Sequence, residues 1–308
     1  MALTDVPLIL SEPQIGNLLT WEELLDEMET ALIELSAGRV LQPIRTTLSL
    51  TEDAGWFGLM PCVYRDVIGA KLVTVFPRNV NLGLDTHQAS IILFRRQTGE
   101  PLCVMDGRLI TARRTAAVSA LATRELSRKD AKVLAILGSG VQARTHLHAL
   151  KMVRDFKEIR VWSRNPEHAF RFAEEAGATV MSAEQAVSGA DVVITVTHTE
   201  EPVLLGKWLK EDVHVNAVGA VGPTARELDE DVVQNATVVV ESRVAAERES
   251  AEIAQSGAAI YAELGEIFSG LKHKPALAKT VYKSLGVAVE DVAAARLVYE
   301  KAVKTNFY

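Results

Sequence analysis

Hydrophobic and polar positions alternate with a different period in successive regions of the chain. Residues 11–38 place their apolar side chains at helical spacing, with an interruption near Thr20. Thr20 is a typical helix N-cap because Glu23 follows three residues later, and Gly38 is a typical helix end. We therefore expect two helices at the start of the chain.

From Leu41 onward the pattern changes to short runs rich in strand-forming residues. The expected strands are 44–50, 57–60, 70–76, 90–95 and 102–106. The last two flank Gln97-Thr98-Gly99-Glu100, which is typical of a hairpin turn. The first region therefore predicts a mostly antiparallel sheet with helices packed on it.

The remainder of the chain alternates strands with helices. An Ala-rich helix over 111–127 suits a connector, and the tail from 262 to 308 has a helical composition punctuated by glycines. The strands expected between them are 132–137, 158–162, 179–181, 192–196, 214–218 and 237–241. Such alternation is typical of a parallel sheet with both faces covered. The sequence predicts an α/β protein, with an α+β domain over 1–117 and a Rossmann-type doubly wound domain over 118–282.

One turn in the second region predicts a dinucleotide site. The strand 132–137 leads into Gly138-Ser139-Gly140-Val141-Gln142-Ala143, a G-x-G-x-x-A sequence that opens a helix. Gly138 permits the tight turn, Gly140 lets a pyrophosphate approach the backbone, and Ala143 lets the helix pack on the strand. A tight turn without a ligand is the alternative.

The end of the next strand bears on the type of cofactor. NAD-binding proteins place an Asp or Glu there for the ribose 2′-hydroxyl, whereas this chain has Ser163-Arg164-Asn165. A hydroxyl, a guanidinium and an amide can all donate to a 2′-phosphate, so NADPH is favoured and NADH remains possible. The alternative is that Arg164 caps a surface turn. Thr195-Val196-Thr197 ends a later strand, where the ribose or nicotinamide of a cofactor usually lies.

Composition and charge narrow the class of partner. The 308 residues carry a net charge of −7, so no basic surface for nucleic acid or an anionic membrane is indicated, and we expect a small-molecule substrate. No apolar run approaches the ~20 residues that span a bilayer. The N-terminus has no cationic stretch before an apolar core, so we expect no secretory signal. Cys62 and Cys103 lie in apolar surroundings and suggest reduced thiols in a cytoplasmic protein.

Three cations are candidates for a substrate site. Arg45 and Lys71 lie inside apolar, strand-like segments, and Arg114 lies near the predicted domain boundary. A buried cation requires a partner, so each should meet a protein carboxylate or an anionic ligand. Together they suit a carboxylate substrate, and a structural ion pair is the alternative for each one.

The residues needed for metal-dependent or nucleophilic catalysis are not found at suitable spacings in the sequence. His146 and His148 are two positions apart on an expected helix and face different directions, and no other spacing suits a metal, so we expect none. Neither cysteine has a nearby histidine to activate it, and no G-x-S-x-G motif is present. The chemistry therefore falls to the cofactor, which favours hydride transfer.

Several motifs, in this order, resemble the ornithine cyclodeaminase/mu-crystallin family over nearly the whole chain. They are Met105-Asp106-Gly107, Ile110-Thr111, Arg114-Thr115-Ala116-Ala117, the turn 138–143, Val215-Asn216-Ala217-Val218-Gly219 and Lys283-Ser284-Leu285-Gly286. The family includes ornithine and lysine cyclodeaminases, an alanine dehydrogenase, ketimine reductases and mu-crystallin, which also binds thyroid hormone. The resemblance implies a homodimer whose substrate and dimerisation domain, 1–117, is completed by a C-terminal helix, 283–308.

The resemblance also assigns roles to residues. It implies that Arg45, Lys71 and Arg114 bind the substrate carboxylate, with Lys71 catalytic. The turn at Ser163, Arg164 and Asn165 is similar to the one that holds the 2′-phosphate in the NADPH-using mu-crystallin branch. The implied cofactor contacts are Arg114, Thr115, Gly138, Ser139, Gly140, Val141, Gln142, Ser163, Arg164, Asn165, Thr195, Val196, Thr197, Val218, Gly219, Ser284, Leu285 and Gly286.

One departure from the family decides between its activities. Cyclodeaminases and the alanine dehydrogenase carry an Asp two residues after the Val-Gly pair, where this chain has Val221. A valine cannot accept a proton from an amine, although Glu227, Asp229 or a water could supply a base from elsewhere. We therefore predict an NAD(P)H-dependent reductase of cyclic ketimines such as Δ1-pyrroline-2-carboxylate or Δ1-piperideine-2-carboxylate. The alternatives are an ornithine cyclodeaminase, an alanine-type amino-acid dehydrogenase, and a crystallin-like protein that binds thyroid hormone with NADPH.

Overall fold

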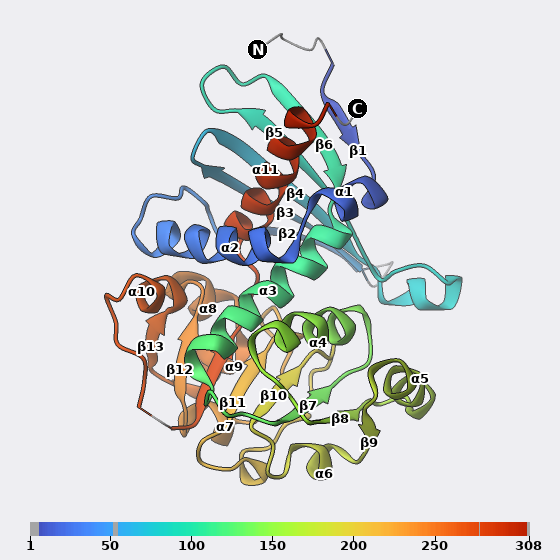
Figure 1. Ribbon diagram of the computed structural model, residues 1–308, viewed down its shortest axis with the longest axis vertical. Coiled ribbons are helices and arrows are strands. Elements are labelled where there is room, and N and C mark those ends of the chain that lie inside the picture. Colours follow the sequence, from blue (N-terminus) through green and yellow to red (C-terminus); the bar gives the residue numbers. More distant parts are fainter. Residues whose placement is uncertain (1–5, 52–54, 277, 307–308) are drawn as a thin grey trace. The chain divides into compact units, whose positions relative to one another are not determined.

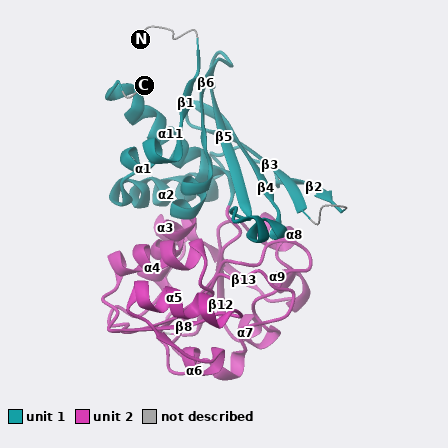
Figure 2. Ribbon diagram, turned by 90° about the vertical axis from the view of Figure 1, so that its right-hand side faces the viewer, with its two compact units in different colours: residues 1–114, 287–308 teal, residues 115–286 magenta. Residues whose placement is uncertain are grey.

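The chain forms two compact units (Figure 2). The computed structural model describes residues 6–51, 55–276 and 278–306. Unit 1 comprises Met1–Arg114 and Val287–Tyr308, and unit 2 comprises Thr115–Gly286. The predicted divisions at 117/118 and 282/283 therefore lie three and four residues from the observed ones. Residues 283–286 belong with unit 2 because Lys283 ends a strand of its sheet.

Unit 1 contains a six-stranded sheet in the order β1-β6-β5-β4-β3-β2 (Figure 1). Its strands are β1 (Leu8–Leu10), β2 (Thr46–Leu50), β3 (Gly55–Tyr64), β4 (Val67–Val75), β5 (His87–Arg95) and β6 (Pro101–Asp106). The pairs from β2 to β6 are antiparallel, as predicted, and β1 adds in parallel to β6. β1 was not predicted because three residues are too few to show a period.

Helices cover one face of this sheet. They are α1 (Glu12–Leu18), α2 (Trp21–Ser36) and α11 (Ala288–Lys304), and α11 packs on β3, β4 and β5. A Cβ at Gly69 on β4 would lie 2.8 Å from Val292, so α11 rests almost on the strand backbone. Lys71 is two residues further along β4 and faces the same side. The opposite face carries partly exposed leucines such as Leu59 and Leu72.

Unit 2 is built on an eight-stranded parallel sheet in the order β13-β12-β14-β11-β10-β7-β8-β9, in agreement with the predicted Rossmann-type fold. Its strands are β7 (Val133–Leu137), β8 (Glu158–Trp162), β9 (Thr179–Val180), β10 (Val192–Thr195), β11 (His214–Ala217), β12 (Thr237–Val240), β13 (Ile260–Glu263) and β14 (Thr280–Lys283). Its helices are α4 (Val141–Val153), α5 (Pro166–Ala176), α6 (Ala183–Val187), α7 (Glu230–Gln234), α8 (Arg243–Glu249), α9 (Ala251–Ser256) and α10 (Leu264–Phe268).

The tail is where the prediction from composition was wrong. The segment 262–308 contains the end of β13 and the whole of β14 in addition to α10 and α11, and the expected C-terminal helix starts at Ala288 rather than at 283. All four residues of β14 are buried between β11 and β12. A buried central strand shows a short continuous run without alternation, which periodicity cannot distinguish from part of a helix.

Helix α3 (Arg108–Leu126) belongs to both units, since the division falls between Arg114 and Thr115. Short 3₁₀ turns occur at η1 (Pro77–Leu82) and η2 (Gly206–Trp208). Among the described residues, no helix combines the length and the apolar character needed to cross a bilayer.

Candidate functional site

The glycine turn of unit 2 has the geometry of a phosphate cradle. Gly138 adopts φ +128°, and a Cβ there would lie 2.8 Å from the carbonyl oxygen of Val196. Gly140 is the N-cap residue of α4, and a Cβ there would meet nothing within 4 Å. Protein packing therefore requires glycine at 138 but not at 140. The space in front of Gly140 fits a group lying directly against the backbone.

The electrostatics of this turn favour an anion. The first backbone N–H groups of an α-helix have no partner within the helix, and they add to the positive end of its dipole. Ala143 is fully buried with Leu134 and Ile136, so α4 packs closely on β7. β7 has β8 on one side and β10 on the other, which makes the boundary between β7 and β10 the switch point of the sheet. The residues present fit a dinucleotide pyrophosphate at this point.

The three residues after β8, Ser163, Arg164 and Asn165, have different surroundings, and Asn165 rather than Arg164 acts as a cap. Ser139 Oγ and Ser163 Oγ are hydrogen-bonded at 2.9 Å. The Oδ1 atom of Asn165 caps α5 by accepting from the backbone N–H of Glu167 at 2.9 Å. Capping, which the sequence suggested as an alternative for Arg164, is thus done by Asn165. The Arg164 side chain is exposed and forms no ion pair with any described residue.

The ends of β10 and β11 are joined by Glu227, which the sequence raised only as an alternative base. Its carboxylate accepts from the hydroxyls of Thr195 and Thr197 at 2.8 and 2.7 Å. It also accepts from the backbone N–H groups of Thr197 and Gly219 at 2.5 and 2.7 Å. The hydroxyls of Thr195 and Thr197, two of the predicted cofactor contacts, are therefore directed toward Glu227. The neighbouring Val196 packs over Gly138, and Val218 lies in the core beneath the turn.

Glu241 shapes the segment that follows β14. Its buried carboxylate accepts from the Ser284 hydroxyl at 3.1 Å and from the backbone N–H groups of Leu285 and Gly286 at 3.0 and 3.2 Å. The three residues predicted to contact the cofactor here therefore have a fixed backbone.

A second cluster of charged groups is buried in unit 1. Lys71 Nζ lies 2.7 Å from Asp291 Oδ2. Arg114 bridges two carboxylates, with Nε 2.8 Å from Asp291 and a terminal nitrogen 2.6 Å from Glu290. All four side chains are at most 4% exposed. Both cations thus have protein carboxylates as partners, and for Lys71 this is the ion pair that the sequence offered as the alternative to a ligand.

Burial and charge set the protonation of this cluster. Burial lowers the pKa of Lys71 to about 8, Asp291 opposes that shift, and Arg114 and Arg45 add to it. Arg45 and Arg114 therefore both lie within electrostatic range of Lys71. Burial alone would raise the pKa of Asp291, but Arg114 and Lys71 lower it below its usual value. Burial, with Lys71 and Arg114, lowers the pKa of His87 to about 4, so this imidazole is neutral at physiological pH.

Sequence reasoning missed His87, Glu290 and Asp291. A signal for the two carboxylates existed, because Glu290 and Asp291 interrupt the apolar run 287–295, and buried carboxylates need cations. No such signal existed for His87, which reaches the cluster only through the strand register that pairs it with Val75. Thr115, the next residue of α3 after Arg114, is buried.

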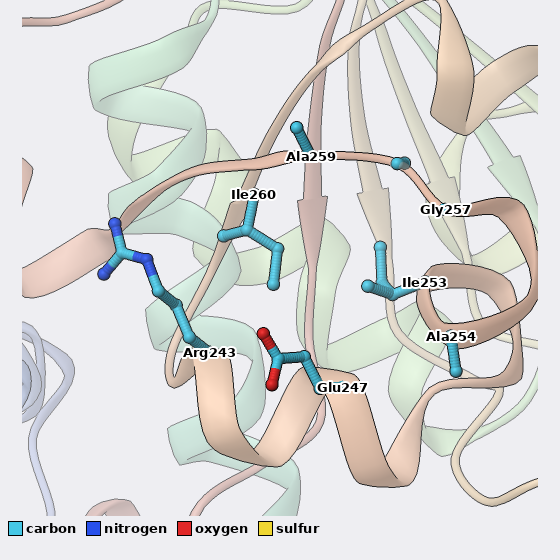
Figure 3. A pocket seen from close by; sticks show the side chains of 8 residues that line it. Arg243, Glu247, Ile253, Ala254, Gly257, Ala259 and Ile260 are labelled. Atoms are coloured by element: carbon cyan, nitrogen blue, oxygen red, sulfur yellow. The ribbon is translucent and has the colours of Figure 1, made fainter.

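A cavity of about 440 Å³ lies elsewhere in unit 2 (Figure 3). Arg243 and Glu247 of α8 and the segment leading into β13 contribute to its lining. It lies at the β13 edge of the sheet, whereas the glycine turn follows β7, which four strands separate from β13. Arg243 is already paired with Glu266 at 2.7 Å. Among the described residues, no group of three or more His, Cys, Asp or Glu is arranged to hold a metal ion.

Comparison with known proteins agrees with the resemblance carried by the motifs. A model of the ornithine cyclodeaminase/mu-crystallin family matches residues 5–306. The chain belongs to this family. It is 45% identical to the ketimine reductase mu-crystallin of Mus musculus over 303 residues, covering 96% of this chain and 97% of that protein.

Two solved structures are similar over nearly the whole length of both chains. One is the Δ1-pyrroline-2-carboxylate reductase of Thermococcus litoralis in complex with NADH and L-proline, with a TM-score of 0.92, 36% identity, and coverage of 97% of this chain and 98% of that one. The other is an archaeal alanine dehydrogenase dimer with bound NAD, with a TM-score of 0.91, 31% identity and 97% coverage of both chains.

Proposed function

We propose that the protein is an NAD(P)H-dependent reductase of cyclic ketimines such as Δ1-pyrroline-2-carboxylate or Δ1-piperideine-2-carboxylate. The observation that carries this proposal is that Lys71 is buried and has one carboxylate partner among the described residues. An ammonium group has three N–H donors, and among the described residues its acceptor is a carboxylate oxygen of Asp291. A buried ammonium with unused donors is costly unless a ligand accepts from them, and a substrate carboxylate suits this need.

For the cofactor, we propose that the turn 138–142 and the N-terminus of α4 hold the pyrophosphate. Support comes from the open space before Gly140. Exposed Arg164 would hold the 2′-phosphate of NADPH, with Ser163 beside it, so that NADPH is preferred over NADH. The segments 195–197 and 218–219 would form the ribose and nicotinamide end of the site, with the fully buried Thr195 beneath its surface, and residues 284–286 would line the rest. When bound, the reduced nicotinamide supplies the hydride that the imine carbon receives.

In unit 1 the proposed roles of the cations differ. Lys71 and Arg45 would hold the substrate carboxylate and orient the C=N bond, with Lys71 next to the reacting group. Arg114 also belongs to this cluster, and its contacts with Asp291 and Glu290 suit it to fix the carboxylates that balance the charge. A cyclic imine that arrives protonated needs a hydride and no further proton, so the chemistry demands little from acid catalysis.

The reductive direction is supported by the carboxylates near position 221. Oxidation of an amine requires a base, and Val221 offers none. Glu227 accepts four hydrogen bonds, and Asp229 caps α7 while accepting from Gly206 at 3.0 Å. Both alternative bases are thus engaged in holding backbone and hydroxyl groups.

We also propose that the protein is a homodimer that associates through the open face of the unit 1 sheet. Leu48, Leu59, Ile68 and Leu72 are between 36% and 57% exposed and lie on its strands, where a second copy would bury them. The dimeric alanine dehydrogenase among the relatives supports this proposal. A cytoplasmic location is supported by the two free, buried cysteines, Cys62 and Cys103.

A substrate panel tests the function directly. The purified protein is assayed with both cyclic ketimines, and with pyruvate plus ammonia, using NADPH and NADH. The reverse reaction is assayed with ornithine, lysine, proline and alanine plus NADP⁺ or NAD⁺. We expect ketimine reduction with NADPH to be the fastest reaction. Faster turnover of ornithine or alanine would replace the proposal with a cyclodeaminase or dehydrogenase, and no turnover with tight NADPH binding would favour a hormone-binding protein.

A further inference from the structure

Glu227 bridges two strands at the carboxyl edge of the unit 2 sheet. It lies in the segment between β11 and α7, and its side chain is fully buried. One oxygen binds the N–H and hydroxyl of Thr197, and the other binds the Thr195 hydroxyl and the Gly219 N–H. The carboxylate thus ties the end of β10 to the segment that follows β11.

This pattern requires a group that only accepts hydrogen bonds. Each oxygen faces one backbone N–H, and a backbone N–H cannot reverse its direction, unlike a hydroxyl. A glutamine at 227 would turn its NH₂ group toward the N–H of either Thr197 or Gly219, whichever way its amide is flipped. Burial and Glu252 raise the pKa of Glu227, and Lys283 opposes them.

Two further buried charged side chains, Glu252 and Lys283, contact the backbone of the segment that contains Glu227. Glu252 on α9 accepts from the backbone N–H of Glu227 at 2.6 Å and of Leu228 at 3.0 Å. Lys283 at the end of β14 lies 2.8 Å from Glu252 and donates to the carbonyl oxygen of Ala220 at 2.6 Å. The segment 219–228 is therefore fixed at both ends.

The segment that follows β11 passes so close to Thr197 that no side chain fits at Gly219. A Cβ there would collide with the backbone of Thr197 and would lie 2.7 Å from Glu227. The two segments are thus in backbone contact, and the N–H groups of Val218 and Gly219 donate directly to the carbonyl oxygen of Thr195 at 3.0 and 3.2 Å. Glu227 adds a second connection by accepting from both segments. Contact this close sets the path of the chain at the edge of the sheet beyond β10 and β11.

We infer that Glu227 is a positioning residue that builds the nicotinamide end of the cofactor site, an inference that rests on the proposed function. Both segments it joins, 195–197 and 218–219, are proposed to line that end. The pyrophosphate and adenosine portions are proposed to bind at 138–142 and 163–165, which Glu227 does not touch. Substitution of Glu227 should therefore weaken the binding of a nucleotide that carries the nicotinamide ring and spare one that lacks it.

The test compares two nucleotides in the Glu227→Gln variant by titration calorimetry. NADPH carries the nicotinamide ring, and 2′-phospho-ADP-ribose lacks it. We expect the variant to bind NADPH about tenfold or more weakly, and to bind 2′-phospho-ADP-ribose within about twofold of wild type. Equal weakening of both nucleotides, or of neither, would overturn the inference. Wild-type protein that binds neither would instead overturn the proposed function.

Asp191→Asn is the matched control. Asp191 precedes Val192, the first residue of β10, and so lies at the end of the strand opposite to Thr195. Its carboxylate accepts from the backbone N–H groups of Lys132 and Val133 and pairs with Lys210. This variant should lower the melting temperature while leaving the ratio of the two affinities unchanged.

If Glu227→Gln does not fold, Thr195→Val replaces it. The Thr195 side chain is fully buried, so its removal acts through Glu227 rather than by direct contact with a ligand. We expect NADPH binding to weaken about threefold or more, with 2′-phospho-ADP-ribose unaffected. An unchanged ratio of affinities in Thr195→Val would overturn the inference.

Discussion

Lys71, in the middle of β4, and Asp291, in the first turn of α11, form a fully buried ion pair with 2.7 Å between Nζ and Oδ2. Burial favours the neutral lysine, whereas Asp291 favours the charged one, and the balance gives Lys71 a pKa of about 8. The charge on the proposed substrate-binding lysine is therefore adjustable within the range of pH in which enzymes are assayed.

The first prediction is a loss of activity at alkaline pH. Lys71 is protonated below its pKa and loses its charge as the pH rises through about 8. If the ammonium holds the substrate carboxylate, kcat/KM for ketimine reduction should be constant near pH 6.5–7 and fall above about pH 8. The pH profile must be corrected for the fraction of imine that is itself protonated.

Asp291→Asn identifies the residue responsible for that fall. Removing the carboxylate removes the interaction that raises the lysine pKa, so the fall in kcat/KM should begin at lower pH than in wild type. Glu290→Gln is the control, because Glu290 pairs with Arg114 rather than with Lys71. Identical profiles in wild type and Asp291→Asn would assign the titration to another group.

The second prediction concerns the cofactor. Arg164→Ala removes a charge-assisted hydrogen bond worth about 1.5–3 kcal/mol, so the KM for NADPH should rise by about one to two decades. Kinetics with NADH should change little, because NADH has no 2′-phosphate. Arg171→Ala, an exposed arginine on α5, provides the control. Equal losses with both cofactors would contradict the assignment of Arg164.

The third prediction uses the position at which the chain departs from the cyclodeaminases. The wild-type protein should reduce ketimines readily and convert ornithine to proline at a negligible rate. Val221→Asp introduces a carboxylate that can accept a proton, so the rate of amine oxidation should increase. Measuring proline formed from ornithine in both proteins checks this. Wild-type conversion near the ketimine rate would mean that position 221 does not decide the activity.

The fourth prediction concerns the dimer. Leu72→Glu places a charge on the open face of the unit 1 sheet, where burial against a second copy would require its desolvation. The mass measured by light scattering should fall from that of two chains to that of one. Leu271→Glu, in unit 2 and 74% exposed, should leave the mass unchanged. A Leu72→Glu variant that retains the dimer mass would place the interface elsewhere.

Local sequence determined the parts of the site that could be predicted. The turn 138–143 can be identified because its glycines, strand and helix are consecutive, and the structure has the expected packing of Ala143. The expectation that Lys71 has a partner also followed from local sequence, since this lysine lies in an apolar segment. The antiparallel and parallel sheets likewise followed from local periods.

Long-range pairing determined the parts that could not be predicted. Nothing near Lys71 indicates that Asp291, on the last helix, lies beside it. Glu227 could be named as a carboxylate near Val221, but its four donors come together only when β10 and β11 are adjacent. Asn165 was predicted as a cofactor contact, and local sequence did not reveal that its Oδ1 atom also caps α5.

The return of α11 to unit 1 has a consequence for how the protein is made. Residues 1–114 leave the ribosome first, but the helix that supplies Asp291 and Glu290 follows the whole of unit 2. At about 5–20 residues per second, synthesis of the intervening residues takes roughly 10–30 s. During that interval Lys71 and Arg114 lack their carboxylates, and β3, β4 and β5 lack the helix that packs on them. Unit 2 is continuous in the chain, so it can fold before α11, the last helix of unit 1, has been synthesised.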